Sequence, residues 1–331
     1  MESDRLLDSR KAPCIIYFHE GFSPYLPFAL SQAARSNPSA RIILLGNQEN
    51  KIKGISYEHH MLSDYSKRHQ EFVDSYQHFH PGCLEDERRC IERWIVLAEF
   101  VQRHRIEEFL FLDSDTLLFE DVRKIFERCR GYDAGGTPIF TGLCAFLKKN
   151  LVPDFADWIL EQYRNPAVVR AWERRFQRHM GGERDEGAVI QDMALAIMFI
   201  EERGIRVLDL TQPKDGKMVD SGQFGRAFQH GTKETDILIQ AHPGSVVSTI
   251  QGGERIDLTA VHVNGYYKNH MPGLTGWSEA VVRSFFRPNY RRNLKQLCIY
   301  LWNGFRFRHY LRKNYEMNPG LRKRSAWQES Q

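Results

Sequence analysis

Long hydrophobic runs and paired cysteines are both missing from this 331-residue chain. Its six cysteines form no Cys-x-x-Cys pair and no spacing typical of a metal site, so neither a disulfide scaffold nor a zinc module is predicted. No apolar run approaches the ~20 residues that a membrane-spanning helix needs. Asn37 is followed by a proline, so the chain has no usable N-glycosylation sequence. These absences favour a location in the reducing cytoplasm.

Positive charge is scarce in most of the chain and concentrated near its end. Residues 1–282 contain 34 basic and 40 acidic residues, a net charge of −6, whereas residues 283–324 contain twelve basic residues and one acidic residue, a net charge of +11. Leucine and aromatic residues recur there at helical spacing, a pattern typical of a helix lying on an anionic membrane surface. The alternative is a helix packed on the protein with a solvated basic face. No nucleic-acid-binding motif accompanies the segment, so nucleic acid is not an expected partner.

The order of the expected elements predicts an α/β fold. Cys14–Phe18 and Arg41–Leu45 are expected to be buried strands, and the helix expected at Pro24–Ala34 would join them as a parallel pair. An amphipathic helix at Cys90–His104 precedes a further buried strand at Phe109–Leu112. Other helices are expected at Asp121–Cys129, Pro153–Tyr163 and Gly187–Glu202, and other strands at Tyr132–Ala134, Leu143–Leu147, Arg206–Leu208, Ile237–Gln240, Val246–Ile250 and Thr259–Val263.

We expect three regions along the chain. Residues 1–12 form an N-terminal tail, residues 13–278 form the main domain, and residues 279–331 form a basic, aromatic-rich extension. Within the main domain, two carboxylates follow the most apolar strand: Asp113 and Asp115 come directly after Phe109–Leu112. Ligands of open α/β sheets bind at this end of the strands, and two carboxylates so close together favour a divalent cation. The alternative is a solvated turn whose aspartates cap the next helix.

The sequence around these aspartates resembles that of the GT-A glycosyltransferases. Residues 90–94 and 113–115 are similar to the approach to their Asp-x-Asp metal site, and residues 15–19 with 42–47 are similar to their nucleotide-binding start. His262–Lys268 resembles the His-x-x-Gly-x-x-Lys signature of the glycogenin-like and lipopolysaccharide galactosyltransferase-like enzymes. The resemblance implies a GT-A-like, Rossmann-related fold. Its mixed, mainly parallel sheet would be flanked by helices and followed by a basic helical extension.

The resemblance also implies roles for individual residues. Asp113, Asp115 and His262 would bind a metal ion, and the imidazole in this set favours Mn2+ over Mg2+. The expected contacts to a nucleotide-sugar are Tyr17, His19, Arg93, Asp113, Gly265 and Lys268. Among these, the glycine would let backbone N–H groups approach the phosphates, and the lysine would add a positive charge beside the leaving group.

The reaction centre is less well marked in the sequence. The residues expected there are Asp192 and, as the second choice, Asp185, although either aspartate could be an ordinary acid at a helix start. The signature also departs from the family after Lys268, because Asn269 and His270 stand where Pro-Trp is usual. The His-x-x-Gly-x-x-Lys motif favours retention of the anomeric configuration over inversion.

The implied function is metal-dependent transfer of a sugar from a nucleotide-sugar, with UDP favoured over GDP. The acceptor would be a glycan or a lipid-linked glycan in surface polysaccharide synthesis, with the enzyme cytoplasmic and peripheral on the membrane. A haloacid-dehalogenase-type phosphatase is an alternative, with Asp113 as the nucleophile and Asp115 as the acid/base. Its second acidic motif would have to be the poor match at Lys214–Asp220. A further alternative is a non-catalytic membrane- or glycan-binding protein.

Overall fold

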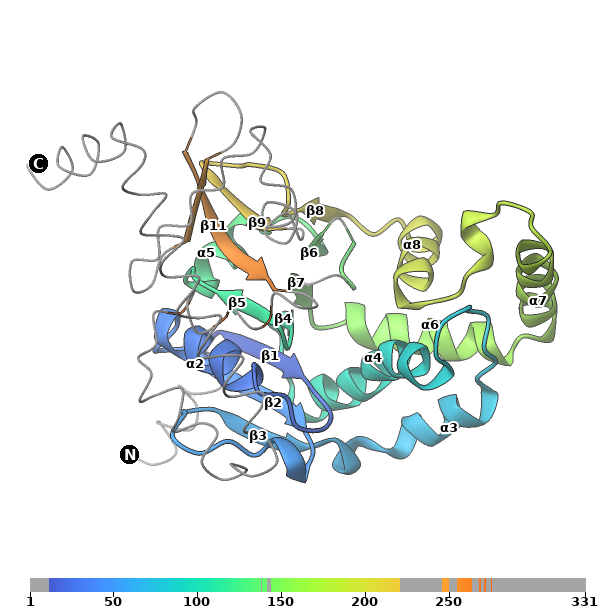
Figure 1. Ribbon diagram of the computed structural model, residues 1–331, viewed down its shortest axis with the longest axis horizontal. Helices are drawn as coiled ribbons and strands as arrows, with labels where there is room; N and C mark the ends of the chain where they lie inside the picture. Colours follow the sequence, from blue (N-terminus) through green and yellow to red (C-terminus); the bar gives the residue numbers. More distant parts are fainter. Residues whose placement is uncertain are drawn as a thin grey trace, which may run out of the picture.

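A seven-stranded mixed sheet forms the centre of the computed structural model (Figure 1). The structure describes residues 12–137, 139–141, 144–220, 246–249, 255–263, 268, 271 and 275, with the backbone alone at 186, 246–249 and 255. The strands lie in the order β3-β2-β1-β4-β7-β6-β8. They are β1 (Cys14–Phe18), β2 (Arg41–Gly46), β3 (Glu58–Met61), β4 (Glu108–Asp113), β6 (Ala134–Gly136), β7 (Cys144–Lys148) and β8 (Val207–Asp209). All neighbours are parallel except where β7 pairs with β4 and β6.

A second, smaller sheet continues from the end of β4. It contains β5 (Thr116–Leu118), β9 (Lys217–Asp220), β10 (Val246–Thr249) and β11 (Arg255–His262). In this sheet β11 is antiparallel to both β5 and β10 and parallel to β9. Only two residues, Ser114 and Asp115, separate β4 from β5, and they form the segment that joins the two sheets.

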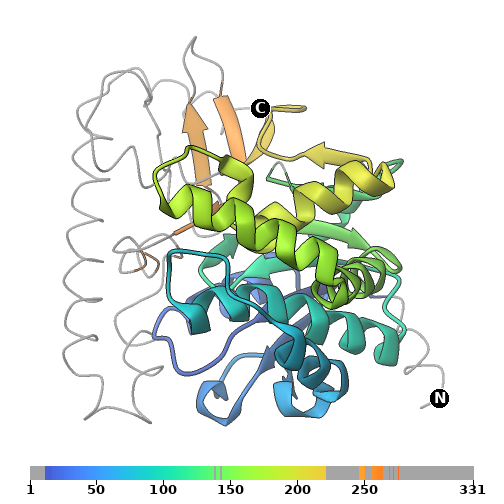
Figure 2. The ribbon, with the colours of Figure 1, turned by 90° about the vertical axis from the view of Figure 1, so that its right-hand side faces the viewer.

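Helices cover both faces of the main sheet. They are α2 (Leu26–Ser36), α3 (Lys67–Ser75), α4 (Leu84–His104), α5 (Val122–Arg128), α6 (Leu151–Arg164), α7 (Pro166–Met180) and α8 (Asp192–Arg203), with short 3-10 turns at Gln48–Asn50, Leu62–Tyr65 and Glu186–Ala188. Helix α6 contacts α4, α7 and α8, and α8 also contacts the teal α4 (Figure 2). Acidic side chains at 85–87 in the first turn of α4 complement the positive end of its dipole.

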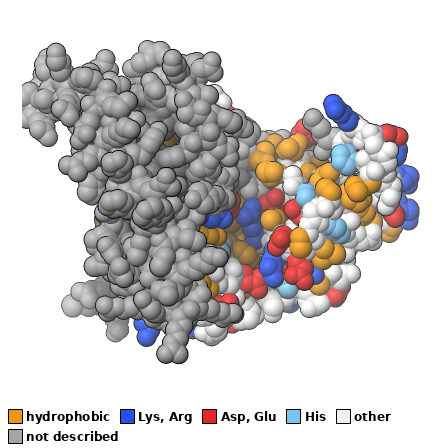
Figure 3. All heavy atoms as spheres, in the orientation of Figure 1, with side chains coloured by type: hydrophobic (Ala, Val, Ile, Leu, Met, Phe, Trp, Pro, Cys, Tyr) orange, Lys and Arg blue, Asp and Glu red, His pale blue; other side chains and the backbone are white. Residues whose placement is uncertain are grey.

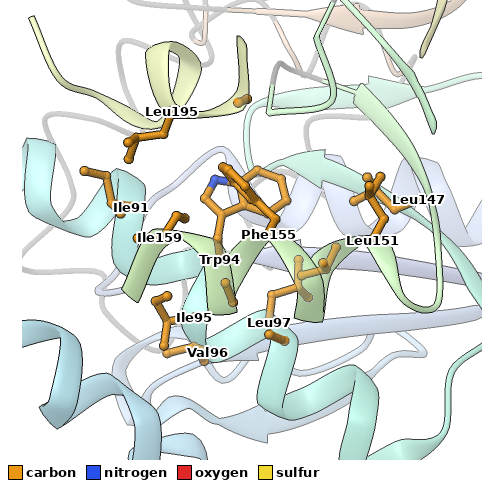
Figure 4. Close-up of a cluster of buried hydrophobic side chains, with 14 of the residues drawn as sticks. Ile91, Trp94, Ile95, Val96, Leu97, Leu147, Leu151, Phe155, Ile159 and Leu195 are labelled. Atoms are coloured by element: carbon orange, nitrogen blue, oxygen red, sulfur yellow. The ribbon is translucent and has the colours of Figure 1, made fainter. Parts of the chain in front are cut away.

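Alternate side chains of β1 enter two different hydrophobic cores. Ile16 packs in the core that includes α4, α6 and α8, whereas Ile15 and Tyr17 pack in the core that includes α2 and α5. Trp94 is fully buried in the first core beside Phe155 (Figure 4). Burial of such a side chain contributes about 1.5–3 kcal/mol of stability. This packing holds α4 in a fixed position against the sheet.

The predicted α/β architecture is confirmed, including the parallel pair of β1 and β2 and the buried strand before Asp113. The sequence did not predict α7, β3, β5 or β9. The helix expected to begin at Gly187 instead begins at Asp192, after a 3-10 turn. The expected strand at Ile237–Gln240 and the basic segment 283–324 lie outside the described residues.

Hydrophobic side chains also reach the surface in the described part of the molecule. Figure 3 shows several of them among charged groups on the side of α7 and α8, and Met180, Met193 and Ile197 are each at least 43% exposed. No helix in the described part of the chain has both the length and the apolar character needed to cross a bilayer.

Candidate metal and nucleotide site

The pairing of β5 with β11 brings two distant motifs together. Thr116 lies opposite His262 in the antiparallel register, and the backbone N–H of Val263 donates to the carbonyl oxygen of Asp115 at 3.0 Å. His262 follows Asp115 by 147 positions in the sequence. Strand register therefore places the imidazole at the carboxyl end of β4, beside the aspartates.

Asp113, Asp115 and His262 form one cluster of possible metal ligands. Each offers a ligand atom, and these atoms all lie within 4.8 Å of one another. His262 Nε2 is 3.1 Å from Asp115 Oδ1, and Lys268 Nζ is 2.9 Å from Asp115 Oδ2. Two carboxylates and one imidazole in a largely buried position are a donor set that suits a divalent metal such as Mn2+. The residues present therefore fit the expected metal ion.

The two aspartates of the cluster differ electrostatically. Burial raises the pKa of Asp115, but its ion pairs with His262 and Lys268 outweigh burial and lower the pKa to about 2. The contact with Asp115, together with the charges of Asp113 and Asp220, raises the pKa of His262 in spite of its burial. Burial raises the pKa of Asp113, and its ion pair with Arg93 offsets this effect only in part. Asp115 is therefore the more firmly ionised of the two carboxylates.

Arg93 connects the cluster to the start of α8. Its guanidinium donates to Asp113 Oδ1 at 2.8 Å, to Asp192 Oδ2 at 2.7 Å and to the carbonyl oxygen of Thr141 at 3.2 Å. Asp192 also accepts a hydrogen bond from Trp94 Nε1 at 3.3 Å. The arginine side chain is only 16% exposed. Three elements, α4, β4 and α8, are thus joined by one buried cation and two carboxylates.

His19 follows β1 and lies at the same edge of the sheet. Its Nδ1 is 2.9 Å from Ser114 Oγ, between the two aspartates in the sequence. Burial, together with the charge of Lys268, lowers the pKa of His19 to about 4, so the imidazole is neutral at pH 7. Its ring meets the Tyr25 ring edge-on, and the Lys268 ammonium lies 4.6 Å from the centre of that same tyrosine ring.

The chain is similar to several solved structures at low sequence identity. No family model matches the chain, and no curated protein matches its sequence. Three solved structures are similar to it. Mouse xyloside xylosyltransferase 1 in its apo form has a TM-score of 0.44 and 11% identity, with 76% of this chain and 98% of that chain covered. An active-site mutant of LgtC has a TM-score of 0.38 and 10% identity, with 80% and 95% covered. The apo glycosyltransferase GlyE of Streptococcus pneumoniae has a TM-score of 0.34 and 12% identity, with 66% and 50% covered.

These similar structures are glycosyltransferases. Since each TM-score lies below 0.5, the roles proposed below rest on the side-chain geometry of this chain.

The structure places most of the expected glycosyltransferase residues in the cluster and leaves two outside it. Tyr17 is fully buried in the core against α2, with its hydroxyl 3.5 Å from the carbonyl oxygens of Ala29 and Thr116. The contact between Tyr17 and a nucleotide therefore stays a prediction, and its side chain packs in the core in this structure. Asp185 forms a two-point ion pair with Arg175 and caps the N–H of Gly187. Among the described residues, no contact joins Asp185 to the metal cluster.

Some residues of the site were not expected from the sequence. Ser114, Tyr25 and Trp94 contact His19, Lys268 and Asp192 respectively. The position of Ser114 between two aspartates was a usable signal, whereas the other two contacts depend on tertiary packing. Gly265 lies outside the described residues.

Proposed function

We propose that this chain is a metal-dependent glycosyltransferase that uses a nucleotide-sugar donor. The observation that supports this function best is the meeting of Asp113, Asp115 and His262, with Lys268 on the second oxygen of Asp115. A divalent cation held there would offset the negative charge of a departing nucleoside diphosphate. The acidic cluster with a lysine at its side is thus suited to a pyrophosphate group.

The chain's own side chains have separable roles in this proposal. Lys268 would exchange its ion pair with Asp115 for one with a phosphate oxygen, since an ammonium group is a mobile point charge. His19 would contact the nucleotide at the end of β1. Arg93 would hold Asp113 and Asp192 in place, and Asp192 would face the transferred sugar. Asp192 is therefore preferred to Asp185 as the residue nearest the reacting carbon.

The protonation of Asp115 disfavours the phosphatase alternative. That reaction requires the second aspartate of the motif to donate a proton to a leaving group. A carboxyl group whose pKa is about 2 holds no proton at neutral pH. Asp115 is therefore better suited to bind a cation than to act as a general acid.

The finer features of the function rest on the resemblance in sequence. They are UDP as the nucleotide, Mn2+ as the metal and retention of the anomeric configuration. The acceptor would be a glycan or lipid-linked glycan of a surface polysaccharide, and the enzyme would work in the cytoplasm at the membrane surface. Each is part of the proposal and can be tested separately.

Thermal and chemical unfolding should show the metal-dependent binding of a nucleotide. UDP at a hundredfold excess over its Kd, with Mn2+ present, should raise the free energy of unfolding by about 2.7 kcal/mol. The increase should be much smaller with EDTA and in His262→Ala. It should persist in Asp157→Asn, which changes a carboxylate that is 64% exposed. Equal stabilisation with EDTA would contradict metal dependence, and hydrolysis of phosphomonoesters without any nucleotide binding would favour the phosphatase.

The basic extension should bind anionic lipid. We expect the full chain to sediment with vesicles that contain phosphatidylserine, because its net charge of +11 over residues 283–324 meets a negative surface. A chain ending at residue 282 should lose this binding and keep metal-dependent nucleotide binding. Neutral phosphatidylcholine vesicles are the control. Equal sedimentation of the two chains would show that the extension is not the lipid-binding element.

A further inference from the structure

The backbone of His19 is fixed from two sides. Its N–H donates to the carbonyl oxygen of Leu45 at 3.0 Å, and its carbonyl oxygen accepts from Asn50 Nδ2 at 2.5 Å. Asn50 is itself buried, and its side-chain oxygen is 3.0 Å from His59 Nε2. The side chain of His19 therefore projects from a rigid position at the end of β1.

The two ring nitrogens of His19 have different environments. Nδ1 is bonded to Ser114 Oγ, whereas Nε2 is buried and has no hydrogen-bond partner among the described residues. A buried polar atom without a partner is costly, so such atoms in native proteins usually have a ligand or water to bind. The ring bearing Nε2 lies beside the proposed site, since Nδ1 contacts Ser114 and the charges of Lys268 and Asp115 act on the imidazole.

A neutral imidazole links its two nitrogens chemically, because one must donate while the other accepts. If a ligand oxygen accepts from Nε2–H, then Nδ1 must accept, and the Ser114 hydroxyl must donate to it. If a ligand N–H donates to Nε2, the roles reverse. Either ligand thus fixes the orientation of the Ser114 hydroxyl, which lies between Asp113 and Asp115 in the chain.

We propose that His19 and Ser114 couple nucleotide binding to the conformation of residues 113–115, which carry the two aspartates. In this proposal Nε2 of His19 binds the nucleotide, and Nδ1 keeps its hydrogen bond to Ser114. This inference rests on the proposed function. In it, His19 is both a nucleotide contact and, through Ser114, a positioning residue for the two aspartates. The coupling is reciprocal: a bound nucleotide raises the affinity for the metal by the same factor as a bound metal raises that for the nucleotide.

Two substitutions of His19 test the roles of its two ring nitrogens separately. The amide of His19→Asn can replace Nδ1 and keep the bond to Ser114, whereas the longer His19→Gln can replace Nε2 and keep the contact to the nucleotide. Ser114→Ala removes the hydroxyl alone. Because the test variants change an uncharged ring or hydroxyl, none of them removes a proposed metal ligand.

Calorimetric titrations give the three quantities that decide the proposal. They are the Kd of UDP in EDTA, the Kd of Mn2+ without UDP, and the factor by which UDP tightens Mn2+ binding. For His19→Asn we expect weaker UDP binding in EDTA and an unchanged Kd for Mn2+ alone. For His19→Gln and Ser114→Ala we expect wild-type UDP binding in EDTA and a coupling factor about threefold to tenfold smaller, the effect of one hydrogen bond. The double variant His19→Gln with Ser114→Ala should show no further loss, since both changes break the same bond.

The outcomes divide cleanly between this inference and the function on which it rests. A wild-type coupling factor in both His19→Gln and Ser114→Ala would overturn the coupling while leaving the glycosyltransferase proposal intact. Equal UDP affinity in His19→Asn and the wild type would overturn the nucleotide contact of Nε2. A merely structural role would weaken Mn2+ binding equally with and without UDP, which also contradicts the coupling. If the wild type binds neither UDP nor GDP with Mn2+, both proposals fail together.

Discussion

Replacing Asp115 with asparagine should reduce metal-dependent turnover of a nucleotide-sugar by about a hundredfold to a thousandfold, the usual effect of removing a group that stabilises charge on a leaving group. Asparagine keeps the shape of the side chain and removes its charge. His262 and Lys268 would then lose the carboxylate that they share, at 3.1 and 2.9 Å. The change would leave the Lys268 ammonium without this partner beside an incomplete metal site.

Hydrolysis of UDP-sugars, measured at increasing Mn2+ concentration, tests this expectation. Asp115→Asn should need far more Mn2+ and should stay slow at saturation, whereas Asp157→Asn should behave as the wild type does. Circular dichroism of each variant verifies that it is folded. Full turnover by Asp115→Asn at the wild-type Mn2+ concentration would remove Asp115 from the proposed metal site.

Replacing Arg93 with alanine should lower the free energy of unfolding by about 3–5 kcal/mol, the usual cost of leaving a buried charge without its partner. Arg93 is the shared partner of Asp113 and Asp192, and the two aspartates come from different elements. The variant would force two carboxylates to remain close together without a cation. The matched control is Arg89→Ala on the same helix, since Arg89 is 49% exposed and pairs with Glu20 on the surface. That control should change stability by no more than about 1 kcal/mol.

The loss in Arg93→Ala should also depend on pH. Burial already raises the pKa of Asp113, and removing the guanidinium would raise it further. A carboxyl group whose pKa is higher in the folded state than in the unfolded state destabilises the fold when it is ionised, and the penalty is relieved by protonation. The difference in stability between Arg93→Ala and the wild type should therefore be largest at neutral pH and shrink as the pH falls through the raised pKa.

Urea unfolding at several pH values measures this effect directly. Adding Asp192→Ala to Arg93→Ala should recover part of the lost stability, because one of the two uncompensated carboxylates is then gone. A difference that stays constant with pH, or a double variant less stable than Arg93→Ala alone, would contradict this electrostatic role of Arg93.

The parts of the fold that follow from local pattern could be predicted from the sequence. The apolar runs of β1, β2 and β4 are continuous because each strand is buried on both faces, as parallel strands are. The helix α7 lacks such a pattern, since only Val169 and Trp172 are buried among many arginines. The strand β5 has three residues, too few to show a period, and it exists because β11 pairs with it.

The site shows the same division between local and tertiary information. Two short motifs predicted the residues that the structure brings together, which are Asp113, Asp115, His262 and Lys268. Their contacts depend on the register between β5 and β11, which the sequence does not show. The burial of Tyr17 has a physical cause, because residues at every second position of a strand share a face and Tyr17 shares the core-facing side of Ile15.

The most direct test of the proposed site is a titration of Mn2+ followed by electron paramagnetic resonance, with and without UDP. We expect the wild type to bind one Mn2+ per chain, more tightly when UDP is present. His262→Ala and Asp115→Asn should lose this binding, because each removes a ligand from the three-residue cluster. Tight Mn2+ binding by both variants, or UDP binding by the wild type that is equally strong in EDTA, would contradict a metal-dependent nucleotide site at these residues.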